Sequence, residues 1–350
     1  MSHGWKDAKV LVAGGAGFVG SNLTMALLDT GVKEIVVVDN LLSSERENIP
    51  DSPRLCFLEG SIADDRILNH IEDGFDYIFQ LATYHGNQSS IRDPLKDHEN
   101  SLLTTLKLFN HIRDFKKVRK VIYSGAGCAV AKKTFGEPKA TTEDEPISLE
   151  MDSPYSISKL VGEFYAVYFH KQYKLPTVRA RFQNVYGPRE ILGAGKWRGT
   201  PATVWRNVIP TFVYKALKGQ PLPVENHGAS TRDFIYVGDI VEGLMACAQK
   251  GGEGEVYNLA SGTETSIRDL AETINKMTGS TIPLHYLPGR DWDTSGKRFG
   301  SAEKAERELD FRTRVSLREG LLRTIEWTRG NLPAIEFCIE RHTKHMVEYS

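Results

Sequence analysis

The chain has 350 residues, of which 40% are hydrophobic and 25% charged, and its formal net charge at pH 7 is −1. This length suffices for a large core and two lobes around a cleft, and the near-zero charge gives no reason to expect a nucleic-acid or membrane-surface partner. The apolar runs are too short for a membrane span, residues 1–9 lack the apolar core of a signal peptide, and the four cysteines are scattered without a C-x-x-C motif, so we expect a cytoplasmic protein without disulfides.

The first predicted unit is a strand, a glycine-rich turn and a helix. Residues 9–13 have the pattern of a short buried strand, residues 10–20 read V-L-V-A-G-G-A-G-F-V-G, and residues 21–28 show helical spacing. In such a unit one glycine allows a tight turn, one lets a pyrophosphate approach the backbone, and one lets the helix pack close to the strand. The three glycines are Gly14, Gly17 and Gly20. The free N–H groups that open the helix would then face the phosphates of a ligand.

A second buried strand, 34–39, ends in an acid. Asp39 lies 19 residues after Gly20, about where a carboxylate accepts hydrogen bonds from the ribose hydroxyls of NAD. The turn and this strand together predict NAD as the cofactor. The alternative is a glycine-rich turn in an ordinary α/β protein.

The first half of the chain continues as alternating strands and helices. Further strands are predicted at 55–58, 77–82, 118–124 and 177–182, and helices at 67–71, 102–112 and 154–173. This alternation predicts an α/β fold, a Rossmann-like doubly wound parallel sheet that binds ligands at the carboxyl ends of its strands.

After residue 188 the pattern changes. Residues 189–203 contain four glycines and a proline without a clear period, which indicates a loop at the cleft. Helices are predicted at 209–218, 239–249 and 267–278, the last capped by Ser266, and short strands at 221–224, 231–237 and 256–259. We therefore predict a cofactor domain of residues 1–184 to which 229–260 return, a smaller substrate-binding lobe of 185–228 and 261–330, and a C-terminal helix at 331–350.

A second chemical signal is Tyr155-Ser-Ile-Ser-Lys159, which opens the long predicted helix. Residues four apart share a helix face, and a nearby ammonium stabilises a phenolate, so Lys159 is expected to lower the pKa of Tyr155 and make it a usable general base. The pair Tyr214 and Lys218 has the same spacing, but Tyr214 lies inside a later helix and is expected to be a packing residue.

These motifs occur together in a characteristic order. They are Gly14/Gly17/Gly20, Asp39-Asn40, Gln80-Leu-Ala-Thr83, Asp93-Pro94 with Asn100, Tyr155-x-x-x-Lys159, Asn184-Val-Tyr-Gly-Pro188 and Arg232-Asp-Phe-Ile-Tyr-Val237. The set resembles the extended short-chain dehydrogenases/reductases, specifically the nucleotide-sugar epimerase/dehydratase group, over about residues 8–325.

The resemblance implies that Tyr155 takes a proton from a sugar hydroxyl while C4 gives a hydride to bound NAD, with Lys159 holding the nicotinamide ribose. It implies a nucleotide-diphosphate sugar as substrate and a homodimer built through helices 102–113 and 154–173. The implied cofactor-binding residues are Gly14, Gly17, Phe18, Val19, Asp39, Asn40, Ser61, Ile62, Leu81, Ala82, Thr83, Tyr155 and Lys159. The implied substrate-binding residues are Tyr84, His85, Ala126, Asn184, Asn207, Arg232 and Arg290.

Two of these substrate residues have a plain alternative. Arg232 is expected to bind the diphosphate because a guanidinium fork matches phosphate oxygens, but it could instead form an ion pair with Asp233. His85 could be a structural histidine.

The turn after the strand ending near Tyr123 departs from the group's pattern. Ala126 occupies the position of the usual catalytic Ser or Thr. Ser124 lies two residues earlier, on the same strand face but about 6–7 Å back. The hydroxyl that normally shares the substrate proton is therefore absent unless the loop shifts, and Ser124 is the catalytic candidate that remains.

The same turn separates subclasses of the group. Dehydratases usually carry Asp-Glu where this chain has Gly127 and Cys128, and decarboxylating relatives carry Glu at the second position, which argues against both. Plain 4-epimerases have a small residue there. A class that inverts C3 and C5 uses a cysteine as base, but its partner lysine would fall near Val208, with Lys196 as a possible substitute.

We therefore favour C4 epimerisation through a 4-keto intermediate. The alternatives are a C3/C5 epimerase that uses Cys128 as base, a dehydratase, and a catalytically silent relative that binds NAD and a nucleotide sugar. No metal site is expected: Cys338, His342 and His345 would share a face of the predicted C-terminal helix, but the sequence offers no obvious fourth ligand.

Overall fold

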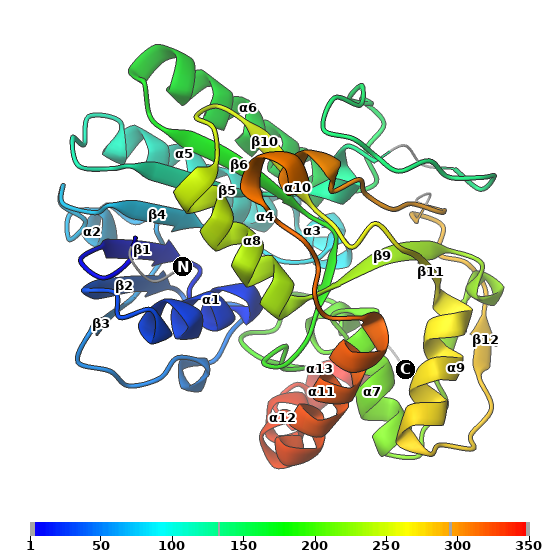
Figure 1. The fold of residues 1–350 in the computed structure, drawn as a ribbon. Helices are drawn as coiled ribbons and strands as arrows, with labels where there is room; N and C mark the ends of the chain where they lie inside the picture. Colours follow the sequence, from blue (N-terminus) through cyan, green and yellow to red (C-terminus); the bar gives the residue numbers. More distant parts are fainter. Residues whose placement is uncertain (1–3, 132–133, 294–295, 348–350) are drawn as a thin grey trace.

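The computed structural model describes residues 4–131, 134–293 and 296–347. A larger lobe surrounds a seven-stranded sheet, and a smaller lobe of short strands and helices lies against the ends of its strands (Figure 1). No helix in the described part of the chain is long and apolar enough to cross a membrane.

All seven strands of the main sheet are parallel, in the order β10-β6-β5-β4-β1-β2-β3. Their bounds are β1 Lys9–Ala13, β2 Glu34–Asp39, β3 Leu55–Glu59, β4 Tyr77–Gln80, β5 Lys120–Ala126, β6 Thr177–Phe182 and β10 Val256–Leu259. The chain therefore has the predicted doubly wound, Rossmann-like α/β fold.

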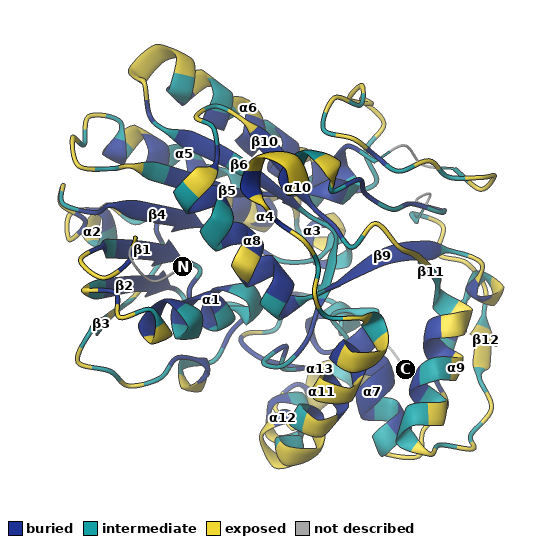
Figure 2. Cartoon of the chain, in the orientation of Figure 1, coloured by how far each residue is buried: buried dark blue, intermediate teal, exposed yellow. Residues whose placement is uncertain are grey.

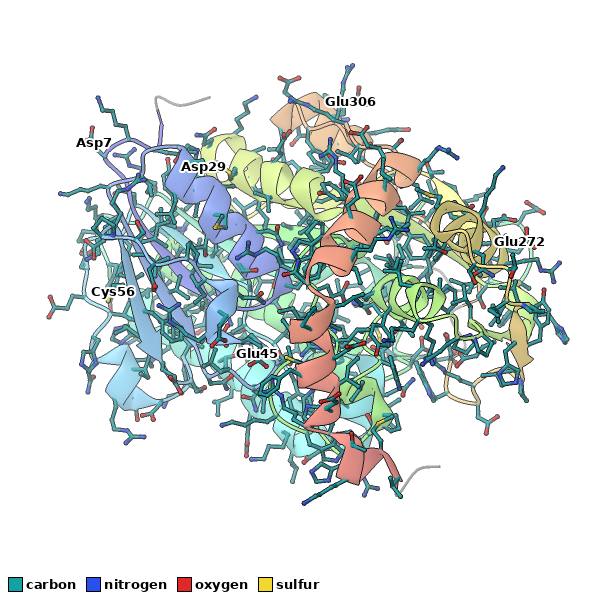
Figure 3. The ribbon with its side chains drawn as sticks, turned by 90° about the horizontal axis from the view of Figure 1, so that it is seen from below. Asp7, Asp29, Glu45, Cys56, Glu272 and Glu306 are labelled. Carbon is teal, nitrogen blue, oxygen red and sulfur yellow. The ribbon has the colours of Figure 1, made fainter. Side chains whose placement is uncertain are left out.

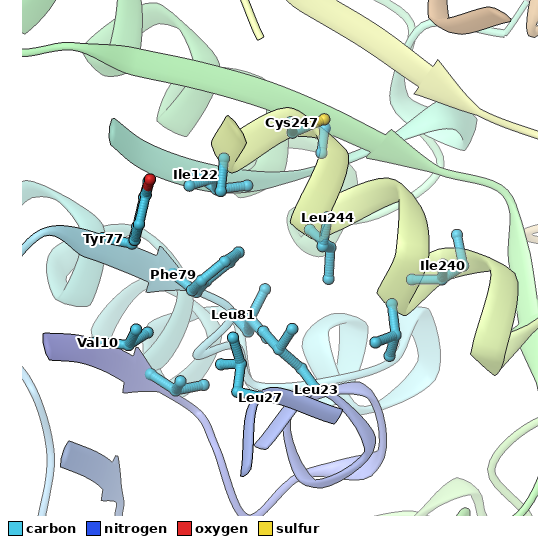
Figure 4. Packing of buried hydrophobic residues seen from close by; sticks show 14 of the residues in the cluster. Val10, Leu23, Leu27, Tyr77, Phe79, Leu81, Ile122, Ile240, Leu244 and Cys247 are labelled. Atoms are coloured by element: carbon cyan, nitrogen blue, oxygen red, sulfur yellow. The ribbon is translucent and has the colours of Figure 1, made fainter. Parts of the chain in front are cut away.

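The strands are apolar on both sides because helices cover both faces of the sheet. On one face, Val10 and Val12 pack with α1 (Phe18–Asp29) and α8 (Val237–Lys250), as Figure 4 shows for Leu23, Leu27 and Leu244. On the other face, the alternate residues of β1 pack with α5 (Leu103–Ile112) and α6 (Pro154–Tyr173). The strands are mostly buried, whereas the outer faces of the helices are exposed (Figure 2).

The smaller lobe has two small sheets and its own core. The three-stranded sheet has the order β11-β9-β7, and β12 pairs with β8. Their bounds are β7 Asn184–Tyr186, β8 Pro223–Glu225, β9 Thr231–Tyr236, β11 Glu264–Ser266 and β12 His285–Leu287, and the helices around this core are α7 Val208–Leu217, α9 Ile267–Thr278 and α11 Leu317–Gly330. Ser266 caps α9 as predicted, since its hydroxyl accepts a hydrogen bond from the N–H of Asp269 at 3.0 Å.

Short helices and turns connect these elements. They are the helices α2 Asp65–Leu68, α3 Asn87–Arg92 and α4 Pro94–Asp97, a π-helical turn His98–Leu102, and the 3₁₀ turns Arg46–Asn48, Gly127–Ala129, Pro201–Thr203 and Asn226–Gly228.

The chain crosses between the two lobes more often than the predicted domain boundaries imply. Within 229–260, α8 and β10 do return to the main sheet, but β9 belongs to the smaller lobe, where it pairs with β7 and β11. Conversely, α10 (Glu303–Leu309) packs on α8 and β10, although 261–330 was assigned to the smaller lobe. Asn184 begins β7 and so marks the first crossing between the lobes.

The single C-terminal helix predicted over 331–350 is wrong for the described residues. Two helices, α12 (Leu332–Glu340) and α13 (Thr343–Met346), are separated at Arg341 and His342. The ring Nε2 of His342 lies 2.9 Å from the carbonyl oxygen of Gly193, and a helix that continued straight would not make this contact. Residues 348–350 lie outside the described part.

The C-terminal segment also holds the loop beside the cleft. The carboxylate of Glu45 accepts hydrogen bonds from the N–H of Gly195 at 2.7 Å and from Arg341 at 2.9 Å, and Figure 3 shows Glu45 beside the C-terminal helices. Glu45 thus ties the glycine-rich loop and α12 to the segment that follows β2.

Candidate active site

A cavity of about 710 Å³ lies between the lobes. Its walls include the turn after β1, the ends of β2, β4 and β5, the start of α6, and residues of β7, α7 and β9 from the smaller lobe. The position agrees with the rule that parallel α/β sheets bind ligands at the carboxyl ends of their strands.

The glycine turn has the geometry of a phosphate site. Gly14 has φ of +80°, which favours glycine at the tight turn, and a side chain at Gly20 would collide with the carbonyl oxygen of Gly14. A Cβ at Gly17 would meet only that same oxygen, at 3.2 Å, so the backbone here is open to close approach. Gly17 is the N-cap of α1 and no side chain caps this helix, which leaves its first N–H groups available to an anion.

Asp39 both lines the cavity and braces the turn. Its carboxylate accepts hydrogen bonds from Ala16 N–H at 3.0 Å, from Leu41 N–H at 2.9 Å and from the Ser44 hydroxyl at 2.9 Å. Burial raises the pKa of this carboxyl, and these hydrogen bonds oppose the rise. Because a carboxylate has about four acceptor positions, capacity remains for a ribose hydroxyl.

The other residues predicted to bind the cofactor line the same cavity. Asn40 donates from Nδ2 to Asn100 Oδ1 at 3.1 Å, and the Thr83 hydroxyl lies 3.2 Å from that of Ser101, so the π-helical turn holds both. The structure brings together every residue predicted to hold the dinucleotide: Gly14, Gly17, Phe18, Val19, Asp39, Asn40, Ser61, Ile62, Leu81, Ala82, Thr83, Tyr155 and Lys159.

Tyr155 and Lys159 lie in the first turns of α6. Ser153 caps this helix by accepting a hydrogen bond from the N–H of Ser156 at 3.3 Å. The Nζ of Lys159 lies 5.9 Å from the centre of the Tyr155 ring. It donates to the main-chain carbonyl of Ser124 at 2.9 Å and to the Ser124 hydroxyl at 3.1 Å, so β5 fixes the ammonium beneath the cavity.

The expected depression of the tyrosine pKa is wrong for the protein alone. Burial raises the pKa of Tyr155 far above its usual value, and the nearby Cys128 and Asp97 add to the rise. Burial lowers the pKa of Lys159 to about 8, against the opposing charge of Asp97. Desolvation of the phenolate thus dominates the pKa of Tyr155, which keeps its proton here.

Ser124, the remaining catalytic candidate, lines the cavity, but its hydroxyl already has two partners. It is buried, and its hydroxyl donates to the carbonyl oxygen of Gln80 at 3.0 Å while accepting from Lys159. The other hydroxyl on β5, that of Tyr123, donates to the main-chain carbonyl of Lys159 at 3.0 Å. Ser124 therefore positions Lys159, and although it lines the cavity its hydroxyl is already engaged by Gln80 and Lys159.

The substrate set is only partly brought together. His85, Asn184, Asn207, Arg232 and Arg290 line the cavity. Ala126 and Tyr84 do not: Ala126 is buried beside Leu160, and Tyr84 is buried with its N–H donating to the Ser101 hydroxyl at 3.0 Å.

His85 is neutral in this site. Burial and the positive charges of Arg206, Arg198 and Lys159 lower its pKa to about 3. Its backbone adopts φ of +56°, a region that L residues rarely occupy, so the surrounding structure fixes its position in the wall.

Arg232 faces the cavity as predicted, and its alternative pairing is wrong. Its guanidinium donates to the carbonyl oxygens of Thr231 and Gly296, both at 2.7 Å, and to Asp293 at 3.3 Å. Asp233 instead accepts hydrogen bonds from Ser261, Gly262 and Gly300.

Cys128 lies in the wall beside Tyr155, in the turn that follows β5. Lys196, the possible partner for a cysteine base, does not line the cavity, and its N–H donates to the Leu42 carbonyl at 2.9 Å. Val208 does line it.

Sequence reasoning missed several charged residues of the wall, among them Glu190 and Arg298. Glu190 is buried, accepts a hydrogen bond from Asn207 Nδ2, and has its pKa raised to about 7 by burial. Arg298 is also nine-tenths buried and lines the cavity. Glu190 lies two residues after the Asn184–Pro188 motif, which is a usable signal, whereas Arg298 lies in a mixed charged stretch that has none.

A doubly wound sheet, a glycine turn at its first strand, and a Tyr-x-x-x-Lys pair opening a helix at the same edge define a short-chain dehydrogenase/reductase. Comparison with known proteins agrees. The family described as the NAD dependent epimerase/dehydratase family matches residues 10–260, so the chain belongs to it, and its cofactor is NAD.

Several solved structures are similar over nearly the whole chain. The Bordetella bronchiseptica enzyme WbmF, crystallised with NAD⁺ and UDP, is 59% identical, with 97% of each chain covered and a TM-score of 0.88. The epimerase Mth375 from Methanothermobacter thermautotrophicus is 39% identical, with 95% of each chain covered and a TM-score of 0.86. A putative UDP-glucose 4-epimerase of Methanocaldococcus jannaschii is 29% identical over 92% of this chain and 99% of its own.

Proposed function

We propose that the protein is an NAD-dependent nucleotide-sugar epimerase that inverts C4 through a transient 4-keto sugar. The observation that carries the proposal is the composition of the wall around Tyr155. No acid stands in the turn 127–129, where dehydratases and decarboxylases of the group place theirs, whereas Tyr155 and Lys159 are in position. Relatives named as UDP-glucose 4-epimerases and a neighbour crystallised with UDP support a UDP-sugar.

Tyr155 is the proton acceptor and donor for the sugar hydroxyl at C4. Bound NAD supplies the hydride acceptor and, later, the hydride donor. The positive charge of Lys159, held against Ser124, favours the phenolate form of Tyr155, and this form accepts the proton that the sugar hydroxyl gives up. Asp39 and the first N–H groups of α1 hold the cofactor, and Arg232 and Asn207 hold the diphosphate.

Because Ala126 stands where relatives have a Ser or Thr, this scheme has no side-chain hydroxyl at that position to relay the proton. With Ser124 bonded to Lys159, the proton passes directly between Tyr155 and the substrate, or through water in the cavity. We therefore propose slower turnover than in relatives that retain the hydroxyl.

A C3/C5 epimerase is the second candidate, because Cys128 lies in the cavity wall beside Tyr155. It is less favoured because no partner lysine stands where that class needs one.

Incubation with UDP-sugars in heavy water separates the candidates. Inversion at C4 by return of the same hydride leaves no solvent deuterium on carbon, and we expect this result. Deuterium at C3 or C5 would instead assign the reaction to Cys128. Tight binding of NAD and UDP-sugars without turnover across a panel of hexoses and uronates would identify a silent relative.

We also propose a homodimer formed through α5 and α6. Three apolar side chains of α6 are about half exposed, Ile157 at 49%, Phe164 at 52% and Tyr168 at 49%. Their spacing along the helix places them on one side, as a partner helix requires.

A further inference from the structure

Arg298 is held in the cavity wall by its backbone. Its N–H donates to the Thr231 hydroxyl at 3.3 Å, and the flanking Lys297 donates to the carbonyl oxygen of Thr134 at 2.7 Å. The side chain lines the cavity, and the residue is only 8% exposed. Its position is therefore set by strand-like contacts on both sides.

The guanidinium of Arg298 has no hydrogen-bond or ion-pair partner among the residues that the structure describes, and its Nε is fully enclosed. The other arginines of the wall differ. Arg232 donates to two carbonyl oxygens, Arg206 donates to the Ser43 carbonyl at 2.7 Å, and Arg290 pairs with Glu225 at 2.6 Å. A buried cation without a partner is unfavourable, so this site is built for an anion that the protein does not supply.

The surroundings of Arg298 indicate which part of the cavity it faces. The side-chain amide of Gln183 is sandwiched between Gly127, which precedes Cys128, and Gly300, two residues beyond Arg298. The segment bearing Arg298 is therefore packed against the turn bearing Cys128. Burial lowers the pKa of Arg232 to about 9 and the positive charge of Arg298 adds to this effect, so the two arginines lie near each other. Arg298 therefore lies near Arg232, which the proposed function assigns to the diphosphate, and on a segment packed through Gln183 against the turn that carries Cys128, so we expect the sugar within its reach.

We propose that Arg298 binds a carboxylate on the sugar, so that the substrate is a nucleotide-linked uronic acid. This inference rests on the proposed function, which places a nucleotide sugar in the cavity. A carboxylate fits because the planar guanidinium presents two parallel N–H donors to its two oxygens. A phosphate oxygen has related chemistry, so the diphosphate itself is the competing source of the anion.

The test compares UDP, UDP-glucose and UDP-glucuronate on the NAD-loaded enzyme, by calorimetric binding and by turnover. We expect wild type to bind the uronate about 10- to 100-fold more tightly than the neutral sugar. Arg298→Gln removes this preference and leaves the affinity for UDP unchanged, and Arg298→Lys keeps part of it because the charge remains. The control Arg312→Gln, at an exposed arginine with 71% of its side chain accessible, changes nothing.

Two results overturn the inference. If Arg298→Gln weakens the binding of UDP as much as the binding of UDP-glucose and UDP-glucuronate, the arginine binds the diphosphate. If wild type shows no preference for the uronate, no carboxylate site exists, and this result stands even if the glutamine variant does not fold. Failure of the proposed function is distinct, since it would leave an Arg298-dependent preference in binding without any inversion at C4.

Discussion

The ammonium of Lys159 and the backbone carbonyl of Ser124 are 2.9 Å apart, and the Ser124 hydroxyl adds a second acceptor at 3.1 Å. This contact joins the helix that carries Tyr155 to the central strand β5. Through this contact Ser124 holds Lys159 in place, whereas a catalytic hydroxyl would exchange a proton with the substrate. The two roles predict different kinetic effects of substitution.

Ser124→Ala should lower kcat by about tenfold while leaving KM and bound NAD unchanged, because one hydrogen bond to a charged group is lost and the backbone carbonyl remains. Tyr155→Phe should lower kcat by about a hundredfold to ten-thousandfold, as expected for loss of an acid–base group. Steady-state kinetics and the absorbance of released NAD measure both effects. Equal losses in the two variants would show that Ser124 takes part in the chemistry directly.

Asp39→Ala should lower both the affinity for NAD and the stability of the fold, because the carboxylate also holds the glycine turn by accepting a hydrogen bond from Ala16. We expect NAD affinity to fall by about 10- to 100-fold and the free energy of unfolding by about 2–4 kcal/mol, since buried N–H groups lose their acceptor. Asp51→Ala is the control, since that side chain is 98% exposed and lies in the same segment. Fluorescence titration and urea unfolding report the two effects, and unchanged NAD affinity would refute the assigned turn.

Glu190→Gln should change how stability depends on pH. The pKa of Glu190 is raised from 4.5 to about 7 in the folded state, so its contribution is complete below about pH 4.5 and is lost as the pH rises through 7. The glutamine variant does not titrate and still accepts a hydrogen bond from Asn207. Relative to the variant, wild type should therefore lose up to about 3 kcal/mol between pH 4.5 and 8.

Urea unfolding at a series of pH values measures this difference. Glu242→Gln is the control, because that side chain is 46% exposed and pairs only with Arg314 at the surface. Parallel curves for wild type and Glu190→Gln would mean that Glu190 does not titrate in this range.

Phe164→Glu should convert the proposed dimer to a monomer, because it places a charge in the apolar side of α6. Leu322→Glu is the matched control: Leu322 is 48% exposed but lies on α11 in the other lobe. Size-exclusion chromatography with light scattering gives the mass directly. A wild-type monomer, or dimers that persist in Phe164→Glu, would refute this interface.

Much of the fold could be predicted because its signals are local. The bounds of β1, β2, β6, β10, α6 and α9 agree with the predicted ranges, and the parallel order follows from the strand–helix alternation. The C-terminal helix was not predictable in the same way. Its break coincides with the contact of His342 with Gly193, which is 149 positions away in the chain.

The residues that line the cofactor half of the cavity could be predicted from the sequence, because the glycine turn, Asp39 and the Tyr155–Lys159 pair have characteristic spacings along the chain. The substrate half could not be predicted in this way, because it depends on contacts between distant segments. The direction of Ser124 depends on Lys159, 35 residues later, and the place of Arg298 depends on Thr231, 67 residues earlier. Burial, which sets the charge state of Tyr155, Lys159 and Glu190, arises only when distant segments pack, and no local pattern encodes it.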